Sequence, residues 1–146
     1  MTYGKHYELV EEFQRAFNQP MALDVVSFNR DRRALRNKLL KEEEAELLDA
    51  MADIAYIIIG TAVEYSGYER NALSQYAKIR DLSKSYFGSY RQFDEAFKRV
   101  HESNMSKLVN GKPVINGHNG VYDESKPMGK VLKPDTYIPV DLSDLV

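Results

Sequence analysis

Cysteine is absent from this chain of 146 residues, which excludes disulfide scaffolds, thiolate zinc sites, iron–sulfur clusters and cysteine nucleophiles. Histidine is scarce as well, and the three that are present leave little for a metal site built from imidazoles. Any metal or acid–base chemistry must therefore rest mainly on carboxylates.

The chain also lacks an excess of positive charge, because 20 Lys and Arg residues face 22 Asp and Glu residues. A net charge of −2 offers no basic surface to hold a nucleic-acid backbone, so no nucleic-acid partner is expected. The longest apolar run, residues 54–63, is far short of the ~20 residues that span a membrane, and residues 1–20 contain no apolar leader core. We expect a soluble, cytoplasmic protein without a membrane partner.

Proline is rare in most of the chain, since Pro20 is the only one before Pro113. The other four prolines fall in the last stretch, together with half of the eight glycines. Such a distribution predicts an all-α fold, with a helical bundle of four to five helices over residues 1–108 and an irregular C-terminal arm over residues 109–146. The length fits a single domain that covers residues 1–146.

Apolar residues at helical spacing give the expected order of elements. Phe13 and Phe17 recur at this spacing in the first helix and are expected in the core. A loop is expected over residues 23–27, and Gly67 is expected to cap the long helix that follows it. The expected helices cover residues 9–17, residues 31–66, a segment from Gly67 to Gly88, and residues 90–107.

Four carboxylates in the long helix, Glu42, Glu46, Asp49 and Asp53, are spaced four, three and four residues apart, which places them on one stripe. A solvated acidic face is the simpler explanation of such a run. However, Asp53 lies within an apolar segment where burial is expected, and a buried carboxylate requires a proton, a base or a cation. Carboxylate oxygens suit Mg²⁺ or Mn²⁺, whereas a di-iron bundle would need a Glu-x-x-His motif that the chain lacks.

Four segments of the chain carry a resemblance to a known family. They are residues 10–17 (VEEFQRAF) with Pro20, residues 32–43 (RRALRNKLLKEE), residues 46–62 (ELLDAMADIAYIIIGTA), and residues 100–108 (VHESNMSKL) followed by residues 129–133 (GKVLK). They resemble the all-α nucleoside triphosphate pyrophosphatases, which comprise the MazG-like proteins, the dimeric dUTPases and phosphoribosyl-ATP pyrophosphohydrolase. The resemblance is closest to the phosphoribosyl-ATP pyrophosphohydrolase-like branch of phages and bacteria.

This resemblance implies a hydrolase that converts a nucleoside or deoxynucleoside triphosphate to the monophosphate and pyrophosphate, with Mg²⁺, or alternatively Mn²⁺, held by carboxylates. The metal ligands that it implies, as a group, are Glu42, Glu43, Glu46, Asp49 and Asp53. Of these, Glu43 and Glu46 are the candidates for the general base. The implied substrate ligands are Asn104, Lys107, Lys130 and Lys133.

The chain departs from the family pattern in one respect, because two acidic motifs that belong on separate helices are fused here. A continuous helix over residues 31–66 would be about 54 Å long, whereas a compact domain of this mass is about 30–40 Å across. We therefore expect a break or a tight turn between about Glu43 and Ala50 that gives two antiparallel helices. The alternative is an uninterrupted helix exchanged between protomers, and in either case a homodimer or a dimer of dimers is expected.

Two other functions stay open at this point. Hydrolysis of phosphoribosyl-ATP would use the same fold and metal chemistry, so that only a substrate assay separates it. A non-catalytic helical oligomer would instead pair the acidic stripe with a basic face of its partner. Release of pyrophosphate and stabilisation by divalent metal would favour the enzyme.

Overall fold

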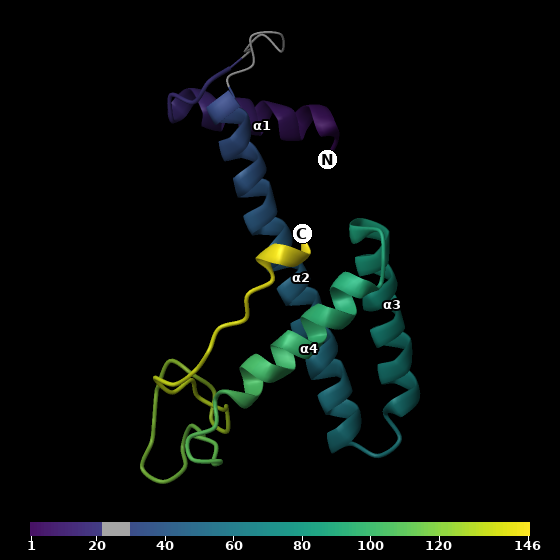
Figure 1. Ribbon diagram of the computed structural model, residues 1–146, viewed down its shortest axis with the longest axis vertical. Helices are drawn as coiled ribbons and strands as arrows, with labels where there is room; N and C mark the ends of the chain where they lie inside the picture. The colour runs from purple at the N-terminus through teal and green to yellow at the C-terminus, as the bar shows by residue number, and fades with distance from the viewer. Residues whose placement is uncertain (22–29) are drawn as a thin grey trace. The chain divides into compact units, whose positions relative to one another are not determined.

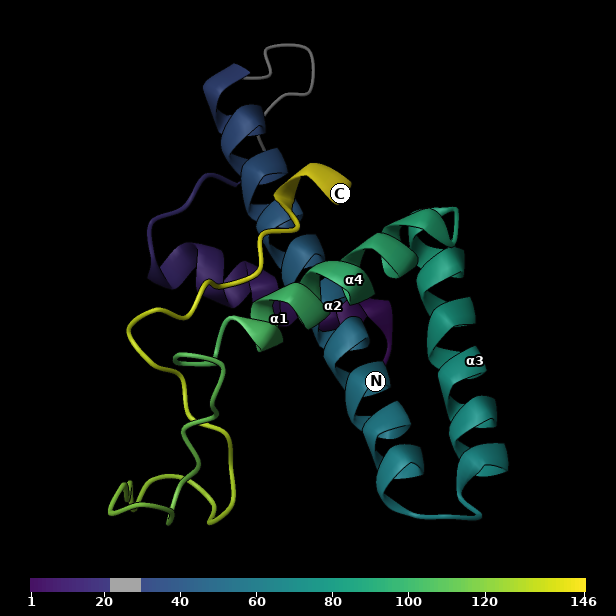
Figure 2. The ribbon, with the colours of Figure 1, turned by 60° about the horizontal axis from the view of Figure 1, so that its bottom comes forward.

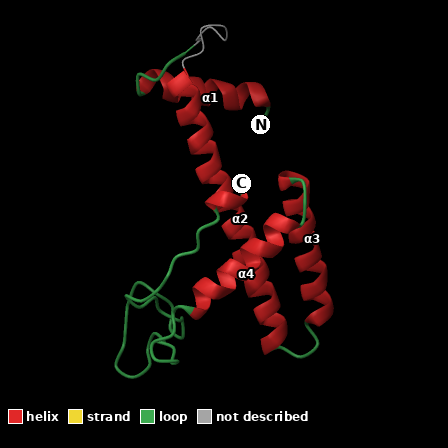
Figure 3. Cartoon of the chain, in the orientation of Figure 1, coloured by secondary structure: helices red, strands yellow, loops and turns green. Residues whose placement is uncertain are grey.

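The computed structural model describes residues 1–21 and 30–146, and the loop predicted over residues 23–27 lies outside them. In the described residues the chain forms four α-helices and a short 3-10 helix near its C-terminus, and no strand (Figures 1 and 3). The elements are α1 (Tyr3–Ala16), α2 (Arg30–Glu64), α3 (Glu69–Phe87), α4 (Arg91–Met105) and η1 (Ser143–Leu145). The all-α prediction is confirmed.

Helix α2 is continuous, so the predicted break between about Glu43 and Ala50 is wrong. The physical reason is local. Residues 43–50 are Glu, Ala, Leu and Asp without glycine or proline, and Ala, Leu and Glu are among the best helix formers. No residue in this stretch offers a turn, and the first interruption comes after Glu64, near Gly67 with its positive φ of 90°.

The ends of the other helices follow the punctuation of the sequence. α1 ends at Ala16, ahead of Pro20, as predicted. α3 ends at Gly88, which adopts the left-handed conformation with φ 91° and donates its backbone N–H to the Lys84 carbonyl oxygen at 2.8 Å. The boundary between helices and arm, predicted at residue 108, lies close to the end of α4 at Met105.

Contacts divide the chain into two compact units, residues 1–39 and residues 40–146. The first unit contains α1 and the start of α2, and α1 has no buried residue. Phe13 and Phe17 stack on each other with ring centroids 4.5 Å apart, yet they are 53% and 62% exposed, so their expected place in the core is wrong. A unit of this size has too little apolar surface to enclose two phenyl rings.

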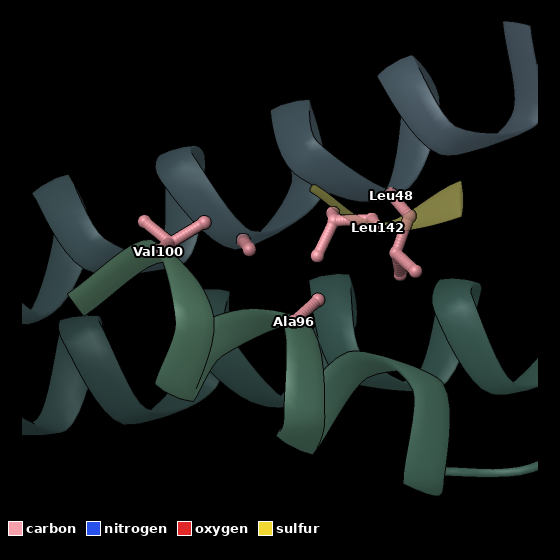
Figure 4. Close-up of a cluster of buried hydrophobic side chains, with 5 residues drawn as sticks. Leu48, Ala96, Val100 and Leu142 are labelled. Atoms are coloured by element: carbon pink, nitrogen blue, oxygen red, sulfur yellow. The ribbon is translucent and has the colours of Figure 1, made fainter. Parts of the chain in front are cut away.

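The second unit holds the hydrophobic core, formed where α2 and α4 face each other. Leu48 and Ala52 from α2 pack with Ala96 and Val100 from α4 (Figure 4). Leu142, which comes from the end of the arm, fills the same cluster. The arm is therefore part of the core packing and is fastened to the helices at its far end.

The arm between α4 and Leu142 has no regular secondary structure (Figure 2). Its loops are organised by hydrogen bonds of Asn116. The Asn116 side chain is fully buried, and its amide nitrogen donates to the carbonyl oxygens of Asp123, Lys126 and Pro127 at 2.9–3.1 Å. Its amide oxygen accepts from the Asp123 backbone N–H at 2.8 Å. One buried side chain thus satisfies the backbone of a loop that has no ladder of its own.

Candidate functional site

All five predicted metal ligands lie on α2, within the second unit. Because the helix is uninterrupted, the stripe of Glu42, Glu46, Asp49 and Asp53 is preserved along one side of it. The side chain of Asp49 is partly buried, whereas the other three residues of the stripe and Glu43 are exposed. Asp49 is therefore the member of the group that lies deepest in the protein.

Asp53 is exposed, so the burial expected from its apolar surroundings is wrong. The buried positions of α2 are Leu48, Ala52 and Ala55, which recur at intervals of four and three and form the face turned to the core. At about 100° per residue, Asp53 lies on a different side of the helix from these residues. Close to Asp53 along the chain, Ala52 and Ala55 are buried on that other face, whereas Ile54 is 46% exposed.

The pKa of Asp49 is raised above its ordinary value of 3.8, first because partial burial disfavours the carboxylate and second because the charge of Asp53 lies nearby. The positive charge of Lys133 acts in the opposite direction and lowers this pKa. Asp49 is thus a carboxylate with an incompletely compensated negative charge, beside a second carboxylate on the same side of the helix.

Such a pair suits a hard divalent cation. Across the described parts of the chain, no three His, Cys, Asp or Glu side chains are grouped so as to hold an ion by themselves. However, Mg²⁺ in nucleotide sites usually keeps several waters and binds one or two carboxylates, while substrate phosphates complete the octahedron. Asp49 and Asp53 have the donor chemistry for that share, and Glu46 lies one helical turn before Asp49.

Two of the four predicted substrate ligands lie near one ring, that of Tyr137 in the arm, and a third is hydrogen-bonded to one of them. Lys133 Nζ lies 4.9 Å and Lys107 Nζ 5.7 Å from the centroid of this ring. Lys107 also donates a hydrogen bond of 2.8 Å to the Asn104 side-chain oxygen at the end of α4. We call Asn104, Lys107, Lys133 and Tyr137 the lysine–tyrosine cluster.

Lys130, the fourth predicted substrate ligand, has no contact with the lysine–tyrosine cluster among the interactions of the described residues. Its backbone is instead part of the loop organised by Asn116, since the Asn116 N–H donates to the Lys130 carbonyl oxygen at 2.9 Å. The structure therefore separates the two arm lysines, and only Lys133 joins Lys107.

Two serines of α4 and its C-cap fix the arm at the lysine–tyrosine cluster. Ser103, which is 8% exposed, donates to the Ile138 carbonyl oxygen at 2.7 Å, and its hydroxyl oxygen lies 3.3 Å from the Tyr137 hydroxyl oxygen. Ser106 accepts from the Ile138 backbone N–H at 2.8 Å. The backbone beside Tyr137 is thus bonded on both sides to the end of α4.

Sequence reasoning missed Tyr137, which it treated only as part of an apolar piece of the arm. A signal was available in the sequence. Tyr137 lies four residues after Lys133 and between Pro134 and Pro139, and these prolines leave its partly exposed ring without a local helix to pack against. Its proximity to Lys107 depends on the fold of the whole arm, and no local pattern encodes it.

The same lysine, Lys133, therefore links the lysine–tyrosine cluster to the carboxylates of α2. The ammonium group of Lys133 thus lies within electrostatic range of the carboxylate of Asp49. In the described residues, no helix combines the length and apolarity that crossing a lipid bilayer requires.

No protein-family model, curated protein or solved structure matches this chain.

Proposed function

We propose that this protein is a Mg²⁺-dependent nucleoside triphosphate pyrophosphohydrolase. What supports it best is that Lys133, whose Nζ lies 4.9 Å from the centroid of the Tyr137 ring, also acts through its charge on Asp49, so that a cation suited to phosphate is within electrostatic range of a carboxylate suited to a metal ion. A triphosphate with its bound cation carries negative phosphates and a positive metal ion. The lysines match the phosphates, and the carboxylates of α2 match the metal ion.

In the proposed reaction, a water oxygen forms a bond to the α-phosphorus while the bond from this phosphorus to the bridging oxygen breaks. Nucleoside monophosphate and pyrophosphate are the products. The proton of the water passes to a carboxylate of α2, for which Glu43 and Glu46 are the candidates, since both are exposed and neither is held in an ion pair within the described residues. Mg²⁺, when bound, would neutralise the phosphate oxygens and lower the pKa of the attacking water.

The lysine–tyrosine cluster supplies the substrate side of this reaction. Lys107 and Lys133 bind the β- and γ-phosphates as point charges, which stabilises the negative charge that pyrophosphate gains as it leaves. Asn104 keeps Lys107 in place through the 2.8 Å hydrogen bond and has an amide nitrogen left to donate to the substrate. Manganese is expected to replace magnesium in the assay, because both prefer oxygen ligands.

The proposal includes self-association as a homodimer or a dimer of dimers. Its support is the second half of α2, where Ile54, Ile57 and Val63 are 46%, 70% and 83% exposed. Apolar side chains of this size gain about 1.5–3 kcal/mol each when fully buried, and a second copy of α2 would cover them and supply further carboxylates. The variant Ile57→Glu should then sediment with a lower mass than the wild type. An active wild-type protein that already sediments as a particle of 16.8 kDa would contradict self-association.

The test is a screen of ribo- and deoxyribonucleoside triphosphates and phosphoribosyl-ATP, with Mg²⁺, for release of pyrophosphate. The variants Asp49→Asn and Lys133→Met should lose activity. The variant Lys126→Met, which changes an exposed residue of the arm, should leave activity unchanged. Preference for phosphoribosyl-ATP would assign the chain to that substrate with the same metal chemistry. Pyrophosphate release in a cytoplasmic fraction would support the expected location. No release from any of these substrates would leave the non-catalytic helical oligomer as the better account.

A further inference from the structure

We propose that Tyr137 is a positioning residue, whose ring holds the ammonium groups of Lys107 and Lys133 together so that both bind one polyphosphate chain. This inference rests on the proposed function and adds to it a residue that no local sequence pattern indicates. The two lysines come from different parts of the chain, one from the turn after α4 and one from the arm, and Tyr137 is the side chain that both approach.

The distances carry the argument. An ammonium group within about 6 Å of an aromatic centroid is attracted by the negative face of the ring, and both Nζ atoms, at 4.9 and 5.7 Å, lie inside this range. Without the ring, nothing would keep these two like charges near the same point, since each lysine has a flexible four-carbon stem. The ring therefore reduces the conformational entropy that the two lysine side chains lose when a polyphosphate binds.

Tyr137 is itself held by contacts that do not involve either lysine. The Ile138 carbonyl oxygen accepts from Ser103, and the Ile138 N–H donates to Ser106, so the backbone adjoining Tyr137 is fixed to α4. The Tyr137 backbone N–H donates to the Pro134 carbonyl oxygen at 3.0 Å, which closes a turn that also contains the residues after Lys133. The ring is thus placed by its backbone, and the contact of its hydroxyl with Ser103, at 3.3 Å, is secondary.

Because the backbone bonds place the ring and the hydroxyl contact is secondary, two variants of Tyr137 should behave differently. Tyr137→Phe keeps the ring and should keep both lysines in place, because the backbone bonds of Ile138 remain. Tyr137→Leu keeps a large apolar side chain but removes the aromatic face. The matched control is Tyr122→Leu, since Tyr122 lies in the same arm, is 64% exposed and has no contact with either lysine in the described residues.

Two measurements on the full chain test the inference. The first is the proton chemical shift of the lysine ε-methylene groups, assigned with Lys107→Arg and Lys133→Arg. A ring near the ammonium groups should shift both signals upfield in the wild type and in Tyr137→Phe, but not in Tyr137→Leu. The second is calorimetric binding of inorganic triphosphate with Mg²⁺, which should weaken about five- to thirty-fold in Tyr137→Leu and less than about twofold in Tyr137→Phe and Tyr122→Leu.

The outcomes distinguish the inference from the function on which it rests. Absence of the upfield shifts in the wild type would overturn the positioning role whatever the activity. Equal triphosphate affinity of the wild type and Tyr137→Leu, with the chains equally folded by circular dichroism, would overturn the inference and leave the proposed function standing. A wild-type chain that binds no triphosphate would contradict the proposed function, and with it the role of Tyr137 in polyphosphate binding.

Discussion

Lys133, in the C-terminal arm, lies close enough to Asp49 in α2 for its positive charge to lower the pKa that burial and Asp53 raise. Since Lys133 also faces the ring of Tyr137, one ammonium group connects the carboxylates of α2 with the lysine–tyrosine cluster. This connection brings carboxylates and ammonium groups together within one compact unit, residues 40–146.

Asp49→Asn should stabilise the protein without metal and abolish its response to metal. The pKa of Asp49 is raised, so ionisation of this group opposes folding at every pH above its raised pKa, and a neutral amide removes that cost. We expect a higher melting temperature than the wild type at neutral pH without Mg²⁺. Addition of millimolar Mg²⁺ should raise the melting temperature of the wild type but not of Asp49→Asn.

The control for this prediction is Glu124→Gln, because Glu124 is exposed in the arm and belongs to neither half of the site. It should melt as the wild type does and keep the full response to Mg²⁺. An Asp49→Asn protein that is stabilised by Mg²⁺ as strongly as the wild type would exclude Asp49 as a metal ligand.

Lys133→Met should raise the KM for the triphosphate by about tenfold or more, since hydrogen bonds to charged groups are worth about 1.5–3 kcal/mol. Methionine keeps much of the apolar stem and removes the ammonium group. Steady-state kinetics with the best substrate would measure this KM, with Lys126→Met as the matched control in the same arm. A KM that rises equally in both variants would indicate general electrostatics instead of a defined contact.

Leu48→Ala should destabilise the chain by about 2–5 kcal/mol, because Leu48 is fully buried in the cluster that joins α2, α4 and Leu142. Leu73→Ala on α3 is the matched control, since Leu73 is 67% exposed, and we expect a loss of less than about 1 kcal/mol. Denaturant unfolding measures both. Similar losses for the two variants would contradict the assignment of the core.

Acid should loosen the contacts that α4 makes with α3 and with the C-terminus. Arg80 bonds Asp94 at 2.7 and 2.8 Å, and Arg99 bonds Asp144 at 2.5 and 3.0 Å, so the pKa of each of these carboxyl groups is lowered below 3.8. A lowered folded-state pKa adds stability above pH of about 3.8, which is lost as the pH falls through the lower value.

Both aspartates are largely exposed, so solvent screens each ion pair and its contribution to stability is small. The unfolding free energy should decrease as the pH falls below about 4, and Asp94→Asn should flatten part of this decrease. A profile of the variant that parallels the wild type throughout this range would show that the Arg80 pair contributes nothing to it.

The helix ends could be predicted from the sequence because glycine and proline act locally. Gly88 ends α3 in a left-handed conformation, and Pro20 follows the end of α1. The break expected between about Glu43 and Ala50 was wrong because it rested on a family pattern and on the size of a compact domain, whereas the residues of that stretch favour helix throughout.

The candidate site could be predicted only in part. The stripe of carboxylates follows from helical spacing, but the exposure of Asp53 depends on which face of α2 meets α4. Lys107, Lys133 and Asn104 were singled out by a resemblance, and their meeting depends on how the arm returns to α4. Tyr137 takes part only through that long-range closure, which no short-range periodicity expresses.

The most direct test of the central proposal is hydrolysis in water enriched in heavy oxygen, with the products separated and analysed by mass spectrometry. Attack on the α-phosphorus predicts one labelled oxygen in the nucleoside monophosphate, unlabelled pyrophosphate in equal amount, and strict dependence on Mg²⁺ and Asp49. Label in inorganic phosphate, or no turnover of any nucleoside triphosphate with Mg²⁺ or Mn²⁺, would contradict the proposal.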